Sequence, residues 1–309
     1  MRRFFSIILA LSLTAPGVLL GSSRGTVGFS FLRTQVGARP AGMGGAFVAV
    51  PGELQGLLSN PAGVAEIEQR SAFAGYLDHV LDLKSGFVAY GDRFRDLGSY
   101  EAAVTFMDYG KMNETDVSGL RTGRTFGAGT VVISAAGGKK FLRNVLVGVT
   151  AKYVRSYIDA YSSQALLMDA GVIVHTPVQD LDVGLAVQNV GTVMSAFVDS
   201  ADALPVCFRI GAAKRLAHLP LLLSFELFKY PDDDFQGAIG GEFTITPRFF
   251  LRWGYTSLSR QMKVGTDADQ MAGLSLGFGF VWKKYRLDYA FSSQGELGSL
   301  NRLGFSAAF

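Results

Sequence analysis

Apolar residues alternate with small or polar residues along most of the chain after about residue 72. In the segment 271–282, for example, Leu274 and Leu276 alternate with Gly273 and Ser275. Successive side chains of a β-strand point to opposite faces of the sheet, so this period of two predicts strands with one face toward an apolar medium. Strands of a soluble sandwich alternate in the same way, but many segments here are about 10 residues long, which is typical of tilted membrane-spanning strands.

These segments predict an all-β fold, a transmembrane antiparallel β-barrel of about 14 strands in residues 71–309, with 12 or 16 strands as alternatives. We expect strands at 72–80, 84–92, 98–108, 124–134, 144–157, 161–176, 180–190, 205–216, 219–230, 235–246, 248–256, 271–281, 284–293 and 301–309. Bacterial barrels have even strand numbers, long outside loops and short inside turns. The connections follow this rule except near Asp159, where an outside turn is short, and at 134–144, where an inside connection is long.

Residues 1–23 have the pattern of a cleaved secretory signal peptide. Two arginines precede an apolar run from residue 4 to 13, and Pro16 and Gly17 interrupt the run before it reaches the length of a membrane-spanning helix. Cleavage after Gly17 and cleavage after Ser23 both fit this pattern. An exported, apolar chain without a helical span is typical of the outer-membrane barrels, so we predict the bacterial outer membrane as its location.

The composition excludes several functional classes. The chain is 49% hydrophobic and 18% charged, and its net charge of +3 is too small for a nucleic-acid-binding face. Cys207 is the single cysteine, so no disulfide forms within the chain, and we expect a packed thiol there. The three histidines lack the partners of a metal site, and no G-x-S-x-G motif is present. We therefore expect no enzyme, no cofactor and no bound metal.

A glycine-rich stretch, GARPAGMGGAFVAV at 37–50, precedes the first predicted strand. It looks like a phosphate-binding loop, but the G-x-G-x-x-G spacing and the Lys-Ser or Lys-Thr pair of such loops are absent. Residues 24–70 do not alternate, and a segment of this length would fit inside the barrel, where glycine suits a crowded backbone. We therefore predict a plug or hatch at 24–70 rather than a nucleotide site.

Several motifs resemble the PorV/PorQ family of outer-membrane barrels, which are relatives of the FadL long-chain fatty-acid transporters. These motifs are GARPAGMGGAFVAV, SNPAGVAEI, VGLAVQNVG, LPVCFRIGAA and, at the C-terminus, LDYAF and GELGSLNRLGFSAAF. The resemblance implies a FadL-like barrel of 14 strands with its N-terminal segment in the lumen as a hatch. The residues that match the hatch motif are Gly42, Gly44, Gly45, Asn60, Pro61, Ala62 and Gly63. The C-terminal Phe309 resembles the signal that the barrel-assembly machinery reads.

Two functions follow from the resemblance. PorV members work in type IX secretion, which implies partners among secreted proteins with a C-terminal sorting domain or an export complex, and VMSAFV at 193–198 is our candidate surface for them. FadL relatives pass hydrophobic small molecules through the barrel, which requires an apolar pocket beside the hatch. Our candidates for its lining are Phe29, Phe31, Met43 and Phe47. From the sequence we favour the secretion role, with transport as the alternative.

Charged residues on the predicted lumen face form the last group of candidates. They are Lys152, Asp169, Arg209, Glu226, Glu242, Arg252, Arg286 and Asp288. Charges inside a barrel must be paired or hydrated, so they form either a network that anchors the plug or a polar conduit with a ligand site. Outer-membrane lipid and lipopolysaccharide would surround the barrel. The acidic PDDD at 231–234 would bind a divalent cation that bridges lipopolysaccharide, or would simply be solvated.

Overall fold

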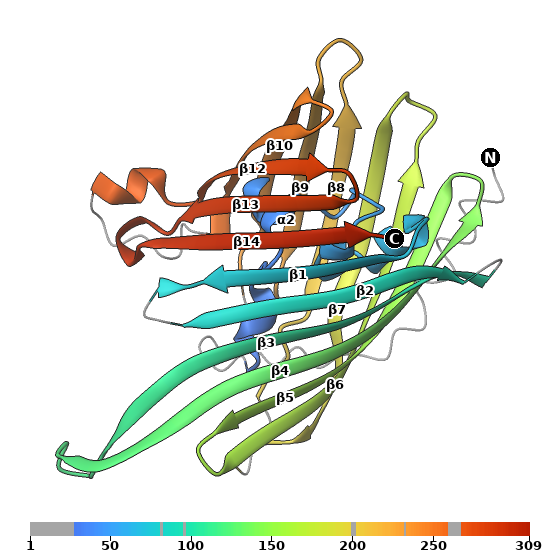
Figure 1. The fold of residues 1–309 in the computed structure, drawn as a ribbon. Coiled ribbons are helices and arrows are strands. Elements are labelled where there is room, and N and C mark those ends of the chain that lie inside the picture. Colours follow the sequence, from blue (N-terminus) through green and yellow to red (C-terminus); the bar gives the residue numbers. More distant parts are fainter. Residues whose placement is uncertain (1–27, 81–82, 95–96, 199–201, 232, 259–266) are drawn as a thin grey trace.

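The computed structural model describes residues 28–309 except 81–82, 95–96, 199–201, 232 and 259–266 (Figure 1). The predicted signal peptide, residues 1–23, and residues 24–27 of the predicted plug therefore lie outside the described residues. No helix among the described residues is long and apolar enough to cross a membrane.

The described residues form a closed antiparallel barrel of 14 strands, so the predicted fold and strand number are confirmed. The strands are β1 (Ser71–Asp78), β2 (Lys84–Phe94), β3 (Gly98–Thr115), β4 (Arg121–Leu142), β5 (Val145–Ile158), β6 (Tyr161–His175), β7 (Leu181–Ser195), β8 (Cys207–Arg215), β9 (Leu221–Lys229), β10 (Gln236–Thr246), β11 (Phe249–Thr256), β12 (Leu274–Trp282), β13 (Tyr285–Ser293) and β14 (Ser299–Ala308). Each strand pairs with its neighbours in sequence. β1 closes the barrel on β14, from Ser71 opposite Ala308 to Asp78 opposite Asn301.

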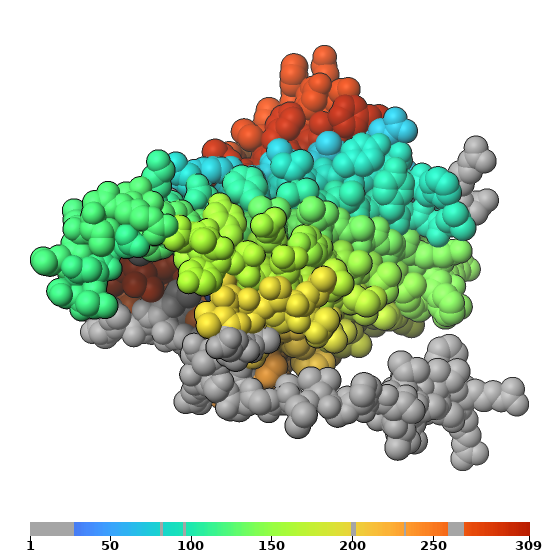
Figure 2. Space-filling view, turned by 90° about the horizontal axis from the view of Figure 1, so that it is seen from below, coloured from blue at the N-terminus to red at the C-terminus, as the bar shows by residue number. Residues whose placement is uncertain are grey.

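The hairpin of β3 and β4 is much longer than predicted. β2 pairs with β3 only as far as Asp108, and β5 pairs with β4 only as far as Ala128, so the rest of the hairpin projects beyond its neighbours (Figures 1 and 2). The predicted loop at 110–123 is thus mainly strand, with a tight turn from Asp116 to Leu120. Both faces of this extension meet water, so apolar alternation is lost there and the sequence looks like a loop.

The predicted exception at 134–144 disappears in the same way. β4 continues to Leu142, and a two-residue turn connects it to β5. All connections at this end of the barrel are short, and the chain ends there at Phe309. We call it the short-turn end, and we call the opposite end, where the β3–β4 hairpin projects, the hairpin end.

The inward-facing and outward-facing side chains of the strands, which form alternating rows, differ in burial and polarity. Along β4 and β6 the outward side chains are apolar and exposed, as at Ile133 (54%), Leu166 (49%) and Met168 (58%). The inward rows of the same strands are buried, as at Val132 and Leu167. Closure of the barrel pairs the backbone hydrogen-bonding groups of every strand, and the apolar outer face can contact lipid. A bilayer requires both of a membrane-spanning β structure.

Residues 28–70, which we call the inner segment, lie inside the barrel (Figure 1). The segment forms four short helices: η1 (Ser30–Arg33), α2 (Ala38–Gly42), η2 (Leu54–Leu58) and η3 (Pro61–Glu66). Asn60 caps η3, because its side-chain oxygen accepts a hydrogen bond from the Ala62 amide, and Pro61 occupies the first helical position. At the hairpin end, η7 (Asp267–Met271) and η8 (Gly295–Leu297) lie in the connections.

Candidate functional site: the inner segment and the barrel wall

Glycines of the barrel wall face the backbone of the inner segment. A Cβ atom on Gly148 would meet the Pro61 carbonyl, and one on Gly138 would meet the Ala65 amide. A Cβ atom on Gly171 would overlap the side-chain oxygen of Asn60. Strand register places these three glycines side by side, with Gly138 opposite Gly148 and Gly148 opposite Gly171. Three adjacent strands therefore leave room for η3 at one level of the barrel.

The same pairing of glycines recurs around the barrel. Gly184 of β7 is opposite Gly211 of β8, and both face Val48 of the inner segment. Gly240 of β10 is opposite Gly254 of β11, and both face Met43. Glycines on the lumen face of the strands were expected to leave room for a plug, but only the strand register shows which of them are neighbours.

The predicted hatch-motif residues lie in two parts of the inner segment. Gly44 and Gly45 have positive φ angles of 65° and 84°, which favour glycine, and Gly44 packs on the backbone of Tyr255 in β11. Gly42, Ala62 and Gly63 are buried. Asn60 donates from its side chain to the Val48 carbonyl at 2.7 Å, and at 3.3 Å each to the carbonyls of Val172 in β6 and Leu185 in β7. This single amide thus joins two parts of the inner segment to the wall.

An ion-pair cluster joins α2 to the wall, and we call it the Arg39 cluster. Arg39 donates two hydrogen bonds to the Glu242 carboxylate, at 2.8 and 2.7 Å, and one to Glu53 at 2.7 Å. Arg252 bridges Glu242 and Asp288, with nitrogen to oxygen distances of 2.7 and 2.8 Å. Burial disfavours the charged guanidinium, but Glu242 and Glu53 more than offset this, so the pKa of Arg39 lies above its ordinary value.

All eight predicted lumen charges have partners of opposite charge, although Arg39 and Glu53 were not predicted. Arg286 belongs to the Arg39 cluster through Glu53 and Asp288. Glu226 pairs with Arg209 and accepts hydrogen bonds from the backbone amides of Phe47 and Val48, at 3.0 and 2.9 Å. Lys152 pairs with Asp169 and donates to the Asn189 side chain. These contacts favour the anchoring network over an open polar conduit.

The predicted apolar pocket is divided between two clusters, which corrects our expectation. Phe29 and Phe31 pack against Val154 of β5 and Leu167 of β6, near the hairpin end. Met43 and Phe47 pack elsewhere, against Ala213 of β8 and Leu222 of β9. Phe29 and Phe31 precede Met43 and Phe47 by 12 to 18 residues, on separate turns of the inner segment, and sequence order alone did not reveal against which strands each pair would pack.

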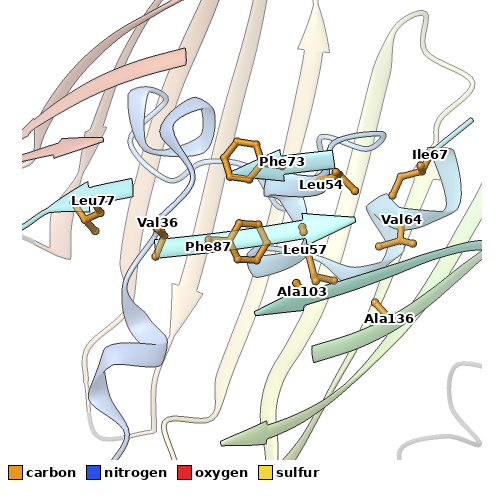
Figure 3. Packing of buried hydrophobic residues seen from close by; sticks show 11 residues of the cluster. Val36, Leu54, Leu57, Val64, Ile67, Phe73, Leu77, Phe87, Ala103 and Ala136 are labelled. Carbon is orange, nitrogen blue, oxygen red and sulfur yellow. The ribbon is translucent and has the colours of Figure 1, made fainter. Parts of the chain in front are cut away.

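A third apolar cluster fixes η2 and η3 to the first strands of the barrel. Leu54 and Leu57 of η2 lie near Phe73 of β1 and Phe87 of β2, and Val64 of η3 lies toward Ala136 of β4 in the same cluster (Figure 3). The rings of Phe73 and Phe87 have their centroids 5.7 Å apart in a tilted arrangement. Burial of this many large side chains stabilises the inner segment in the lumen by several kcal/mol, at about 1.5–3 kcal/mol for each.

The backbone ladder between β7 and β8 ends early in the described residues, and we call this place the β7–β8 seam. β7 pairs with β8 only as far as Gln188 opposite Cys207, while its remainder stays paired with β6. Asn189, with φ of 59°, lies at a bulge in the pairing of β7 with β6. Beyond it the Asn189 side chain donates to the Pro205 carbonyl at 3.0 Å. The Phe29 and Phe31 cluster lies beside the strands that border this seam, because it includes Val193 of β7 and Leu204.

Two cavities open at the short-turn end on either side of the loop that contains Glu53. One has a volume of about 1000 Å³ and extends to Phe309, and the other has about 530 Å³ and extends to His175. His175 contacts Asp182 at 2.7 Å and Glu66 of the inner segment at 3.0 Å. The two cavities make this end of the lumen accessible around the inner segment.

The remaining candidates lie at the ends of the barrel. The Phe309 side chain is exposed, and its amide donates to the Arg70 carbonyl at 2.8 Å. Asp233 of the predicted acidic loop pairs with Arg33 at 2.8 Å, while residue 232 lies outside the described residues. Met194 and Val198 of the 193–198 segment are exposed. Cys207 is buried, as predicted for a packed thiol. The described residues contain no group of three or more potential metal ligands.

Two further titratable groups near the hairpin end were not among the predicted site residues. Arg302 of β14 is buried, and it donates to the Gln35 carbonyl at 2.7 Å and to the Ser292 hydroxyl at 3.0 Å. No carboxylate of the described residues pairs with it. His79 follows β1, and its Nε2 lies 2.7 Å from the Ser85 hydroxyl oxygen. Burial and then the charge of Arg302 lower the pKa of His79 to about 4.

The lowered pKa of His79 predicts acid sensitivity. Histidine in an unfolded chain titrates near pH 6.5, so as the pH falls the unfolded state binds this proton before the folded state does. We expect this part of the stability to be lost as the pH falls from about 6.5 to about 4, and His79→Gln to remove that part of the pH dependence. Urea unfolding of both proteins in detergent at about pH 5 and about pH 7.5 measures it. The prediction is wrong if acid destabilises both proteins equally.

Solved outer-membrane channels have the same fold. The structure matches the Ralstonia pickettii toluene transporter TbuX with a TM-score of 0.61 and 13% identity, over 88% of this chain and 98% of that one. It matches the Pseudomonas putida toluene transporter TodX with a TM-score of 0.60 and 12% identity, over 89% and 98%. A Pseudomonas aeruginosa FadL homologue gives 0.56 and 12%, over 89% and 98%.

These matches show a FadL-like barrel fold, as the sequence resemblance implied. No family model and no curated protein sequence matches the chain. The narrower assignment to PorV/PorQ therefore stays a prediction from the motifs.

Proposed function

We propose that this protein is an outer-membrane channel that passes hydrophobic small molecules toward the periplasm, with residues 24–70 as its hatch. The observation that carries the proposal is the position of Phe29 and Phe31, which fill an apolar cluster beside the β7–β8 seam. An apolar solute that displaced these rings would exchange one apolar contact for another and would meet a place where the wall lacks a continuous ladder. For passage toward the periplasm, the short-turn end faces the periplasm and the hairpin end faces outward, as in bacterial barrels generally.

The anchoring of the hatch supports a gate rather than a permanent seal. Besides the apolar clusters, ion pairs and hydrogen bonds hold the inner segment, as in the Arg39 cluster and at Asn60, and these polar groups can exchange partners with water. The two cavities at the short-turn end leave space for movement around Glu53. The solved channels with this fold include proteins named as toluene transporters, which is in line with the transport role and gives the secretion role no support.

Uptake by cells that express the protein tests the proposal. We expect radiolabelled toluene to enter cells with the protein faster than cells with an empty vector, while entry of a sugar of similar size stays unchanged. Equal toluene entry in both strains, with the barrel shown to be in the outer membrane, would refute the transport role.

A matched pair of variants locates the path. Phe31→Ala removes an apolar ring from the lumen, so we expect faster entry of toluene, together with a loss of stability of about 3–5 kcal/mol. Phe106→Ala removes an outward ring that is 41% exposed, and we expect uptake to be unchanged. If both variants change uptake alike, the solute does not pass the Phe29 and Phe31 cluster.

The secretion role predicted from the motifs depends on the resemblance alone. Its binding surface would include Met194 and Val198, which are exposed at the hairpin end. Purification of the tagged protein from its native membrane separates the two functions. Secreted proteins that share a C-terminal domain would favour secretion, and apolar molecules without such proteins would favour transport.

A further inference from the structure

The outer wall has a groove near the short-turn end, where β4 to β7 pass over the inner segment. Its volume is about 640 Å³, which is within the range of about 300–1,000 Å³ that is usual for small-molecule sites. The groove begins at Leu97, between β2 and β3, and reaches Val187 of β7. Its lining is apolar except for Ser99 and Lys139.

The groove exists because the residues at its floor carry little or no side chain. Gly137 and Ala170 occupy outward positions where the same rows, nearer the hairpin end, carry Ile133 and Met168. Behind this floor, the wall glycines bring the strands against the Pro61 to Ala65 region of the inner segment. A bilayer leaves no empty volume beside a barrel, so an apolar chain has to fill this groove.

Lys139 gives the groove a charged rim. It lies on the outward row of β4, two residues beyond Gly137 and three residues before the strand ends at Leu142. Its position is thus at the edge of the apolar band, where a lysine extends its ammonium group toward the headgroups. No carboxylate of the described residues forms an ion pair with Lys139. Basic sites beside an apolar membrane surface bind anionic lipid headgroups.

We propose that this groove binds one anionic phospholipid of the periplasmic leaflet. The phosphate contacts the Lys139 ammonium group, and an acyl chain lies over Gly137 and Ala170. The headgroup assignment rests on the membrane orientation given under the proposed function, but the groove does not depend on solute transport. A hydrocarbon in transit would contact the apolar floor and would gain nothing from Lys139. Dependence of binding on the Lys139 charge therefore distinguishes a phospholipid from a transported hydrocarbon.

Native mass spectrometry of the detergent-purified protein with equal amounts of phosphatidylglycerol and phosphatidylethanolamine tests the assignment. We expect the unaltered protein to retain one phosphatidylglycerol. Ala170→Leu fills the groove and should abolish retention. Lys139→Gln should lower phosphatidylglycerol retention roughly fivefold and remove the preference over phosphatidylethanolamine.

The chain supplies a matched control for each variant. Ala151→Leu makes the same change at an outward position of β5 that is not part of the groove, and Lys140→Gln changes the neighbouring lysine, which is on the opposite row of β4. Both should retain the lipid, and heat-modifiable migration on gels verifies that every variant is folded. The proposal is overturned if no variant changes retention, if each control loses lipid as its partner does, or if toluene displaces the lipid and binds equally well to Lys139→Gln.

Discussion

Arg39→Met is expected to release the inner segment from the wall and to make the barrel leak ions. Arg39 and Glu242 are only 5% and 3% exposed, and loss of the guanidinium leaves the Glu242 carboxylate with fewer cations in a buried site. Removing one partner of a buried ion pair costs about 3–5 kcal/mol. Since the lost contacts join α2 to β10, most of that cost should appear as release of the hatch rather than as unfolding of the strands. Conductance across a planar bilayer measures the leak.

Arg70→Met is the matched control for this experiment. Arg70 also pairs with a carboxylate, Asp92 at 3.1 Å, but its side chain is 61% exposed and the pair lies outside the lumen. Exposed ion pairs contribute about 0–1 kcal/mol, so this variant should conduct like the unaltered protein. If the Arg39→Met variant also conducts like the unaltered protein, the apolar clusters alone hold the inner segment and the Arg39 cluster is not needed to keep it in place.

Alternation predicted the barrel well because a bilayer outside and a packed lumen inside impose opposite chemistry on every strand. The segment predicted at 161–176 is the strand Tyr161–His175, and the one predicted at 284–293 is Tyr285–Ser293. The prediction was wrong where one of these two environments is missing. The hairpin at 109–127 has water on both faces, so its pattern gave no strand signal.

The candidate site was predicted only in part, for a related reason. Charges such as Glu242 and Asp288 are conspicuous on an otherwise apolar strand, so the sequence identified them as lumen residues. Arg39 and Glu53 are in a segment without periodicity, and nothing in the local sequence says which wall residues they meet. Contacts between segments some 200 residues apart, such as Arg39 with Glu242, depend on the register of the whole barrel.

Gly138→Val is expected to displace η3 from the wall. A Cβ atom at this position would overlap the Ala65 amide, and the neighbouring contacts are also backbone atoms, which cannot turn aside as a side chain can. Valine has a high propensity for β-strands, so the substitution favours the strand itself while it removes the contact with the inner segment. Overpacking of this kind costs about 1–3 kcal/mol, and the direct backbone overlap places this variant at the upper end. Exposure of the inner segment to a protease added from the short-turn end measures the displacement.

Gly137→Val provides the control at the adjacent residue. Its Cβ atom would have no heavy atom within 4 Å and would point outward, so the same valine on the same strand meets no part of the inner segment. We expect proteolysis of this variant at the rate of the unaltered protein. Faster cleavage in Gly138→Val alone would establish that the wall glycines hold η3 in place. Equal rates in all three proteins would mean that the strands bend to accept the side chain, and the close fit between wall and inner segment would then contribute little to closure.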